Sequence, residues 1–309
     1  MHHDWSGIEA FCLSRQIGLT FSEPMARHTS LGIGGPADML LSPDEQSLLE
    51  VIAVLRDKQI PYTVLGRGTN VLVHDGGIEG AVILTAAMKT CSLSGNGTAC
   101  VQSGMARQAF IVSAIRAGFS GMEGLAGIPG SVGGAVAGNA GSFGYEMKDV
   151  VVSCSVLLPD GVLREMGTKE MAFAYRKTGL PDGAVIVSTE VGLKRDDPVE
   201  IQKRFRSFMK EKKAGQPVWQ RSAGCVFRNP PGLSAGKLID EAGCKGMTAG
   251  GISVSTVHAN FFINSACGTA VDFLRLMDAV ARRVHHAFGI ILEPEIRKIG
   301  RWGQTCKLH

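Results

Sequence analysis

The sequence predicts a mixed α+β protein built from about three modules, and three observations support this prediction. The chain has 309 residues, which is enough for two or three cores of ordinary domain size. Hydrophobic residues make up 45% of it and charged residues 19%, a balance typical of globular proteins. Helical and strand-like patterns alternate along the chain, and many of its 40 glycines gather in short passages between them. Clustered glycines indicate loops that approach another group closely.

The overall charge excludes some partners. The net charge is +4, from 32 basic and 28 acidic residues. This excess is too small to indicate a nucleic-acid partner, although it suits a small anionic ligand if it is concentrated in one place. No apolar run is long enough to span a bilayer, and the start MHHDWSGIEA lacks the pattern of a signal peptide. We therefore expect a cytoplasmic protein without membrane insertion.

The cysteine pattern indicates neither a metal site nor a disulfide framework. No two cysteines form a C-x-x-C pair, and no histidine spacing completes a zinc site. In a reducing compartment most of them should be free thiols that pack as small hydrophobic groups. The eight are Cys12, Cys91, Cys100, Cys154, Cys225, Cys244, Cys267 and Cys306.

The first module, which we place at residues 1–85, shows a β–α–β rhythm from about residue 20. Its helix is predicted within residues 42–59, with Ser42 as N-cap, Pro43 at the first helical position and Glu45 completing a capping box. A strand, YTVLG, follows and ends in a glycine turn. The apolar stripe of the helix consists of Leu48, Leu49, Ile52 and Leu55.

The second module is predicted at residues 86–197 and the third at 198–309. A helix over 105–117 ends at Gly118, and the strands VVVSCSVLLP and AVIVSTEVGL follow it. The polar, periodic segment 196–217 predicts a helix that leads into the third module. That module holds the strand-like HANFFIN and a final helix over about 270–287, which starts after Thr269 and stops at Gly289.

Two glycine passages are the candidate binding loops. LGRGTNVLV covers residues 65–73, and GLAGIPGSVGGAVAGNAGSFG covers 124–144 with eight glycines. Backbone without Cβ atoms lets several N–H groups converge on a pyrophosphate. Interleaved apolar residues favour ordered loops over flexible Gly/Ser linkers. The stretches GIGGPAD and GLSAGKL fail the spacing of the Rossmann fingerprint and of the P-loop, so a phosphate-rich ligand is expected through neither motif.

Seven motifs in order give a specific resemblance. HTSLGIGGPAD, LGRGTNVLV, GLAGIPGSVGGAVAGNAGSFG, FAYRKTG, AGCVFRNP, HANFFIN and LEPEIRKIG span roughly residues 20–300. The chain resembles the MurB family, the UDP-N-acetylenolpyruvoylglucosamine reductases of bacterial peptidoglycan synthesis. The resemblance implies a vanillyl-alcohol-oxidase-like (PCMH-type) FAD-binding fold. Two α/β modules would hold non-covalent FAD, and a C-terminal α+β domain would bind the substrate.

The resemblance also implies the reaction. NADPH would reduce the flavin, and UDP-N-acetylglucosamine enolpyruvate would become UDP-N-acetylmuramate. Residues matching the family's cofactor loops are Gly66, Arg67, Gly68, Thr69, Asn70, Gly127, Ile128, Pro129, Gly130, Ser131, Gly134, Asn139, Ala140 and Gly141.

Three residues match the family's catalytic positions. Arg176 is expected to stabilise the enolate-like charge that develops after hydride addition, although an Arg after Tyr is by itself more typical of a surface ion pair. Glu295 is expected to assist protonation or to polarise the substrate carboxylate. Glu293 is its alternative, because the two would share one face of a strand.

Cys225 stands where the family usually carries serine. A thiol is a stronger acid than an alcohol, with an unperturbed pKa of about 8.5. Proton transfer to a developing carbanion therefore remains feasible, although sulfur is larger and the S–H group is a weaker hydrogen-bond donor. Without the motif, buried packing would be the ordinary interpretation of this cysteine. Ser222 is an alternative acid, but it does not align with the motif.

Positive charge is concentrated at residues 201–230, where Glu211 is the one acid. A solvated helix face explains part of this run, and a clamp on the UDP diphosphate explains why it is one-sided. By resemblance, Lys213 and Asn229 are the expected diphosphate ligands and Asn260 a further substrate-binding candidate. The basic residues are Lys203, Arg204, Arg206, Lys210, Lys212, Lys213, Arg221 and Arg228.

The chain resembles the shorter class of the family. Its tyrosines are Tyr62, Tyr145 and Tyr175, so no tyrosine-bearing insertion follows the second module. Two alternatives remain open at this point: another PCMH-type flavin oxidoreductase that acts on an alcohol or carbohydrate, and a catalytically silent UDP-sugar-binding paralogue. Neither glycine passage contains a histidine that could link FAD covalently.

Overall fold

The structure is a computed structural model that describes residues 5–302 of the chain, so Cys306 lies outside the described residues. The chain divides into two compact units. Unit 1 contains Met1–Thr20, Met39–Arg67 and Gly80–Lys212. Unit 2 contains Phe21–Asp38, Gly68–Glu79 and Lys213–His309. The C-terminal third therefore shares its unit with two short segments from the first 80 residues.

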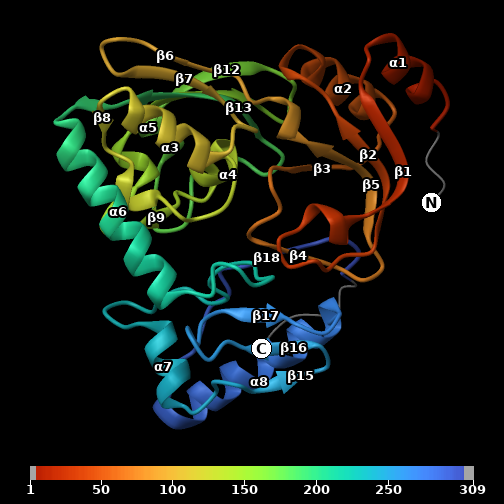
Figure 1. Ribbon diagram of the computed structural model, residues 1–309. Helices are drawn as coiled ribbons and strands as arrows, with labels where there is room; N and C mark the ends of the chain where they lie inside the picture. The colour runs from red at the N-terminus through yellow and green to blue at the C-terminus, as the bar shows by residue number, and fades with distance from the viewer. Residues whose placement is uncertain (1–4, 303–309) are drawn as a thin grey trace. The chain divides into compact units, whose positions relative to one another are not determined.

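A four-stranded sheet with the order β1-β2-β5-β3 begins the fold (Figure 1). β3 (Tyr62–Leu65) runs parallel to β5 (Ile78–Leu84). β1 covers Gly18–Pro24 and β2 covers Pro36–Ser42. Buried side chains of α1 (Ile8–Ser14) and α2 (Glu45–Asp57) share one apolar core with this sheet, including Leu48, Ile52 and Leu55.

The cap of α2 differs from the prediction. The N-cap is Asp44 rather than Ser42, and its carboxylate accepts a hydrogen bond from the Ser47 N–H at 2.8 Å. Ser42 is the last residue of β2, where its backbone is extended. Asp44 stands three residues before Ser47, which is the spacing that an N-cap side chain needs. The helix therefore starts two residues later than a cap at Ser42 requires.

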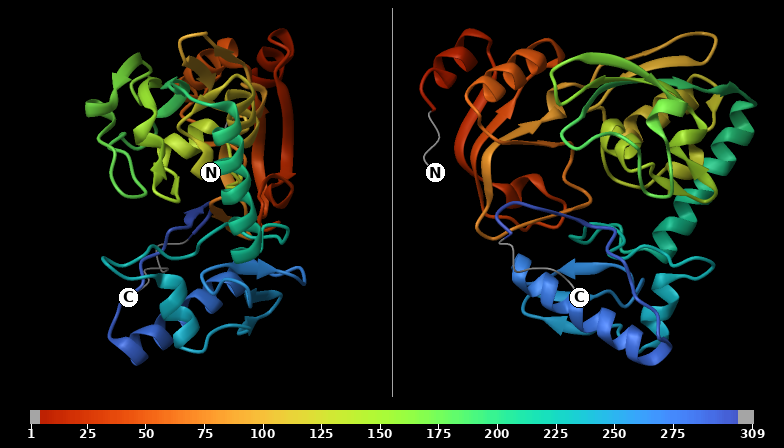
Figure 2. Two further views of the ribbon diagram at one scale, coloured as in Figure 1. Left: turned by 60° about the vertical axis from the view of Figure 1, so that its left-hand side comes forward. Right: turned by 180° about the vertical axis from the view of Figure 1, so that it is seen from behind.

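The second part of unit 1 is a five-stranded antiparallel sheet in the order β12-β11-β13-β7-β6. β11 and β13 confirm the two predicted strands, and α3 confirms the predicted helix, which ends at Arg116, shortly before Gly118 with its positive φ of 78°. Figure 2 shows α3 and α4 beside this sheet, and their apolar faces share its core. The elements are β6 (Cys91–Leu93), β7 (Thr98–Gln102), α3 (Arg107–Arg116), β8 (Phe119–Ser120), α4 (Val132–Ala137), β9 (Gly141–Ser142), β10 (Tyr145–Glu146), β11 (Val151–Leu157), β12 (Leu163–Gly167), α5 (Thr168–Met171), β13 (Val185–Gly192), β14 (Lys194–Arg195) and α6 (Pro198–Gly215).

Unit 2 contains a three-stranded sheet, β15-β16-β17, with α8 packed along it (Figures 1 and 2). α8 starts at the predicted N-cap Thr269, whose capping box is completed by Asp272, and ends at Gly289 with φ 71°. β4 (Val71–Val73) pairs in parallel with β18 (Arg297–Ile299). The remaining elements are α7 (Ala235–Glu241), β15 (Thr248–Ala249), β16 (Ile252–Val254), β17 (Phe262–Asn264) and α8 (Ala270–Phe288).

Short 3-10 helices connect several of these elements. They cover Met25–His28, Thr85–Ala87, Glu123–Leu125 and Met147–Asp149. Among the helices of residues 5–302, none combines the length and the apolar character needed to cross a membrane.

Candidate functional site

The two glycine passages meet within unit 1 at Gly66 and Ser131. A Cβ placed on Gly66 would collide with the Ser131 hydroxyl oxygen. Ser131 is buried at the start of α4, where its hydroxyl accepts a hydrogen bond from the Gly134 N–H at 3.3 Å. A side chain at residue 66 would therefore push the second passage away, which explains the glycine on packing grounds.

Loop 127–131 carries two residues whose backbone favours glycine. Gly127 has φ 72° and Gly130 has φ 136°. The Gly127 N–H donates to Oε1 of Gln108 at 2.8 Å, and a Cβ at Gly127 would lie 2.9 Å from Cδ of Lys212. Ile128 and Gly130 are half-buried, and Pro129 is exposed. The loop is thus ordered by α3 and α6, as the interleaved apolar residues predicted.

Arg107 contacts loop 127–131, and it was not among the residues predicted from the sequence. Its guanidinium is buried and donates to the carbonyls of Ile128 and Pro129. An arginine in the first turn of a helix is usually solvated, so no local signal in the sequence distinguishes this residue.

Arg176 lies on a strained turn of unit 1. Its backbone has φ 56°, in the left-handed region that a residue with a Cβ rarely adopts. Its Nη2 donates to the Gly141 carbonyl at 3.1 Å, and its guanidinium carbon lies 5.2 Å from the centre of the Tyr175 ring. Strain of this kind persists where the surroundings fix the conformation, and it is frequent at functional sites.

Asn139 bonds to the turn that carries Arg176. It is completely buried, and its Nδ2 donates to Glu146 and to the Ala174 carbonyl, each at 3.0 Å. Its Oδ1 accepts the Lys148 N–H at 3.0 Å. Both ends of the Asn139 amide therefore bond within the protein. One of its acceptors, the Ala174 carbonyl, lies two residues before Arg176 in the chain.

The other predicted cofactor residues are divided between the units. Arg67 is exposed, and Gly68 has φ 57° with a carbonyl that accepts the Ser30 N–H at 3.0 Å. Asn70 donates from Nδ2 to the Glu295 carbonyl at 3.3 Å. Gly66 and Arg67 belong to unit 1, whereas Gly68, Thr69 and Asn70 belong to unit 2. Gly134, Ala140 and Gly141 lie with loop 127–131 in unit 1.

Cys225 and Glu295 lie on adjoining backbone segments of unit 2. Cys225 is half-buried and forms an antiparallel bridge with Phe261. The Glu295 N–H donates to the carbonyl of Val226, the residue after Cys225, at 2.8 Å. The structure therefore brings together two of the three predicted catalytic residues through their backbones.

The expected strand face for Glu293 and Glu295 is wrong. Both residues precede β18, and Pro294 between them forms a single bridge with Phe227. Proline lacks the N–H that continuous strand pairing needs. Glu293 is the more exposed of the two, and its carboxylate lies 4.0 Å from the Arg228 guanidinium.

The three predicted substrate-binding residues differ in their solvent exposure. Asn260 is 1% exposed, and both ends of its amide bond to the backbone of Phe227. Asn229 is exposed, and its Oδ1 accepts the Ala235 N–H at 3.0 Å. Lys213 is exposed, with its ammonium 5.8 Å from the centre of the Trp219 ring.

The basic run is less one-sided than its sequence indicates. Arg204 pairs with Glu123 and Asp196, and Lys203 with Glu200. Lys212 is buried, and its ammonium donates to the Ala126 carbonyl at 3.0 Å and to the Ser142 hydroxyl at 3.1 Å. The partner acids lie outside 201–230, so a count within that window could not include them.

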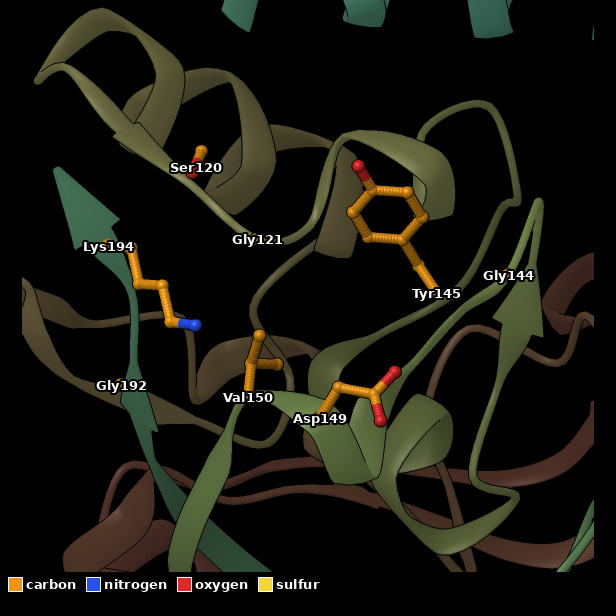
Figure 3. A pocket seen from close by; sticks show the side chains of 8 residues that line it. All are labelled: Ser120, Gly121, Gly144, Tyr145, Asp149, Val150, Gly192 and Lys194. Atoms are coloured by element: carbon orange, nitrogen blue, oxygen red, sulfur yellow. The ribbon is translucent and has the colours of Figure 1, made fainter. Parts of the chain in front are cut away.

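Unit 1 also has a pocket of about 270 Å³ (Figure 3). Tyr145, Asp149 and Lys194 are the largest polar side chains around it. Burial, followed by the charge of Glu123, raises the pKa of the Tyr145 hydroxyl. None of the predicted catalytic, cofactor or substrate residues lines this pocket.

Known proteins are similar over almost the whole chain. Residues 37–167 match the family model of an FAD binding domain, and residues 216–299 match that of the C-terminal domain of UDP-N-acetylenolpyruvoylglucosamine reductase. The enzyme of that name from Rubrobacter xylanophilus is 42% identical over 284 residues, which cover 91% of this chain and 95% of the relative. The one from Heliobacterium modesticaldum is 43% identical over 289 residues, covering 91% and 90%.

A solved structure agrees with these sequence matches. The crystal structure of UDP-N-acetylenolpyruvylglucosamine reductase (MurB) from Thermus caldophilus superposes with a TM-score of 0.78 and 37% identity. The match covers 92% of this chain and 98% of that one.

Proposed function

This chain belongs to the UDP-N-acetylenolpyruvoylglucosamine reductase family, and from this premise we propose how its own residues perform the reaction. It is an FAD-dependent oxidoreductase of the vanillyl-alcohol-oxidase-like fold that uses NADPH as reductant. It reduces UDP-N-acetylglucosamine enolpyruvate to UDP-N-acetylmuramate. We place this activity in the cytoplasm, where it supplies peptidoglycan precursors and through them supports cell shape and division. When bound and reduced by NADPH, FAD would supply the hydride that reduces the enol ether.

The observation that carries the FAD assignment is the close approach of Gly66 to Ser131 in unit 1. Because Gly66 has no Cβ, the two glycine passages pack directly against each other, which places their N–H groups close enough to converge on one pyrophosphate. The buried cation of Arg107 behind loop 127–131 fits an anionic ligand as well. We propose that the FAD-binding part consists of modules 1–85 and 86–197 and that residues 198–309 form the substrate module.

Arg176 is proposed to stabilise the negative charge that develops on the substrate carboxylate after hydride addition. Its bond to the Gly141 carbonyl fixes the direction of the guanidinium. A fixed cation stabilises a developing charge without reorganisation during the step, which is the usual source of the largest catalytic effect.

Cys225 is proposed to protonate the carbon next to the one that receives the hydride. Its neighbour Val226 is held on two sides, since its N–H donates to the Asn260 carbonyl at 2.9 Å and its carbonyl accepts from Glu295. A donor acts efficiently only when it is held within reach of its acceptor. Glu295 is proposed to assist this transfer or to polarise the substrate carboxylate.

Lys213 and Asn229 are proposed as ligands of the UDP diphosphate, because both are exposed and offer N–H donors. Asn260 is proposed to act indirectly. Its buried amide fixes the Phe227 backbone, and so positions the segment that carries Cys225.

An anaerobic two-step experiment tests the function. NADPH should bleach the flavin of the purified protein, and UDP-N-acetylglucosamine enolpyruvate should then restore its yellow colour. If the colour returns only with oxygen, the protein is an oxidase or a silent paralogue and the reductase assignment fails. Flavin that stays attached after denaturation would contradict non-covalent binding.

A further inference from the structure

Arg107 is a buried cation, and no counter-ion pairs with it among residues 5–302. Its side chain is 2% exposed, and it is among the largest fully buried side chains of the protein. Within the described residues, no carboxylate pairs with it and its Nε has no hydrogen-bond acceptor. Buried charges in proteins are nearly always paired, because an unpaired one loses its hydration without compensation.

Three unfavourable effects add at this residue. Burial lowers the pKa of Arg107 to about 10, and the like charge of Arg176 acts in the same direction. Arg107 is also the first residue of α3, where the positive end of the helix dipole repels a cation. The guanidinium remains charged at neutral pH, so an anionic ligand would be a favourable partner for it.

The bonds of Arg107 also orient the loop in front of it. Its Nη2 donates to the carbonyls of Ile128 at 2.7 Å and Pro129 at 3.1 Å, and its backbone N–H donates to the Gly130 carbonyl at 3.1 Å. In a trans peptide the carbonyl and the following N–H point in opposite directions, and no described peptide bond is cis. The N–H groups of Gly130 and Ser131 therefore point away from Arg107.

The N–H groups of Gly130, which is half-buried, and of Ser131, which is buried, are the donors that loop 127–131 can offer to a ligand. Among residues 5–302, no backbone acceptor is bonded to either of them. Successive N–H groups that point the same way form a small anion-binding concavity. A cation behind the concavity raises its affinity for an anion, since burial weakens screening by solvent.

We propose that Arg107 holds loop 127–131 in the conformation that binds the pyrophosphate of FAD, and supplies the buried positive charge that this pyrophosphate neutralises. The inference rests on the proposed assignment of loop 127–131 to FAD. Arg107 is a positioning residue, because its contacts are to the loop.

The test compares Arg107→Met with Arg116→Met, a matched change of an exposed arginine in the last turn of the same helix. The full-length proteins, freed of flavin, are titrated with FAD and separately with riboflavin, which lacks the pyrophosphate. Arg107→Met should weaken FAD binding roughly 10- to 100-fold, as expected for the loss of a charge-assisted contact, and riboflavin binding by less than about threefold. Arg116→Met should change neither.

Equal weakening of FAD and riboflavin, or unchanged FAD binding, would overturn the proposal. If Arg107→Met does not fold, Arg107→Lys decides. Lysine keeps the charge but lacks the planar, forked N–H donors of arginine. FAD binding should therefore weaken roughly three- to tenfold, and riboflavin binding should stay the same. A wild-type protein that binds FAD but fails the anaerobic experiment would refute the proposed reaction and leave this comparison intact.

Discussion

Asn260 bonds to both polar groups of the Phe227 backbone: its Oδ1 accepts the Phe227 N–H at 2.9 Å, and its Nδ2 donates to the Phe227 carbonyl at 2.8 Å. Both residues are buried, so water does not replace the amide if it is lost. The Asn260 amide thus takes the place of a neighbouring strand, because the segment around Phe227 forms isolated bridges rather than a continuous strand. It also holds the backbone two residues after Cys225.

Asn260→Ala should destabilise the protein by about 2–4 kcal/mol, because two buried backbone groups lose their partners. Urea unfolding followed by tryptophan fluorescence measures the change. Asn229→Ala, which removes one bond of an exposed asparagine, should cost less than about 1.5 kcal/mol. Equal costs for the two variants would show that the Asn260 pairing contributes little.

Cys225→Ala should separate the two half-reactions. Reduction of the flavin by NADPH should be unchanged, while reoxidation by the substrate should slow by roughly 10²–10⁴, the usual contribution of a general acid. Cys225→Ser should keep substantial turnover, since a hydroxyl is also a proton donor. Stopped-flow absorbance of the flavin follows both steps.

The control for Cys225 is Cys100→Ala, which changes an exposed thiol. It should leave both half-reactions unchanged. Full substrate reduction by Cys225→Ala would mean that another group, for which Ser222 is the nearest candidate in the sequence, donates the proton.

Gly66→Ala should reduce FAD content and stability together, because the new methyl group collides with the Ser131 hydroxyl. The flavin-to-protein absorbance ratio and thermal unfolding report the two effects. The double variant Gly66→Ala, Ser131→Gly should recover part of the loss, since the collision is then removed. Gly95→Ala is the matched control, because no atom lies within 4 Å of a Cβ there. A Gly66→Ala protein with normal flavin content would contradict close packing of the two passages.

Lys212 and Lys213 are neighbours in the sequence that should give opposite results. Lys212→Met removes a buried ammonium from the Ala126 carbonyl and the Ser142 hydroxyl, and should cost about 1–3 kcal/mol in unfolding free energy. Lys213→Met should leave stability unchanged and raise KM for the UDP substrate. Denaturant unfolding and steady-state kinetics on both variants measure this. Unchanged KM in Lys213→Met would remove it as a diphosphate ligand.

His258 should make the protein less stable as the pH falls below neutrality. Burial is the largest cause that lowers the pKa of His258, and the charge of Lys245 adds to it, against a bond with its own backbone. Its Nδ1 accepts the Asn260 N–H at 3.2 Å, which requires that nitrogen to be unprotonated. Because the folded pKa lies below the unfolded value of about 6.5, the unfolded chain binds more protons in this range.

The stabilisation by neutral His258 is therefore complete above about pH 6.5 and is lost as the pH falls toward the lower folded pKa. His258→Asn, which keeps an acceptor near the Asn260 N–H, should show a smaller loss of unfolding free energy between pH 7 and 5 than the wild type. Thermal unfolding in buffers across this range provides the comparison. Parallel pH profiles for the two proteins would exclude His258 as the cause.

The sequence alone determined the elements whose signals lie within one or two turns of chain. Thr269 and Gly289 predicted the limits of α8 correctly, because caps act on the residues beside them. The order of the motifs also determined the family, because a glycine passage or AGCVFRNP can be recognised from its residues without knowledge of the fold. The misplaced cap of α2 shows the limit of this reasoning: Ser42 and Asp44 are both good caps, and the end of β2 selects between them.

The tertiary structure decided the contacts between residues that lie far apart in the sequence. Val71 pairs with Arg297 across β4 and β18, Lys212 bonds to Ala126, and Asn260 bonds to Phe227. The partners of such groups are fixed by burial, because a buried polar group must find whichever donor or acceptor the packing brings to it. In the sequence Arg107 is an ordinary helix residue. Only the packing of α3 beneath loop 127–131 makes it a buried charge that needs an anion.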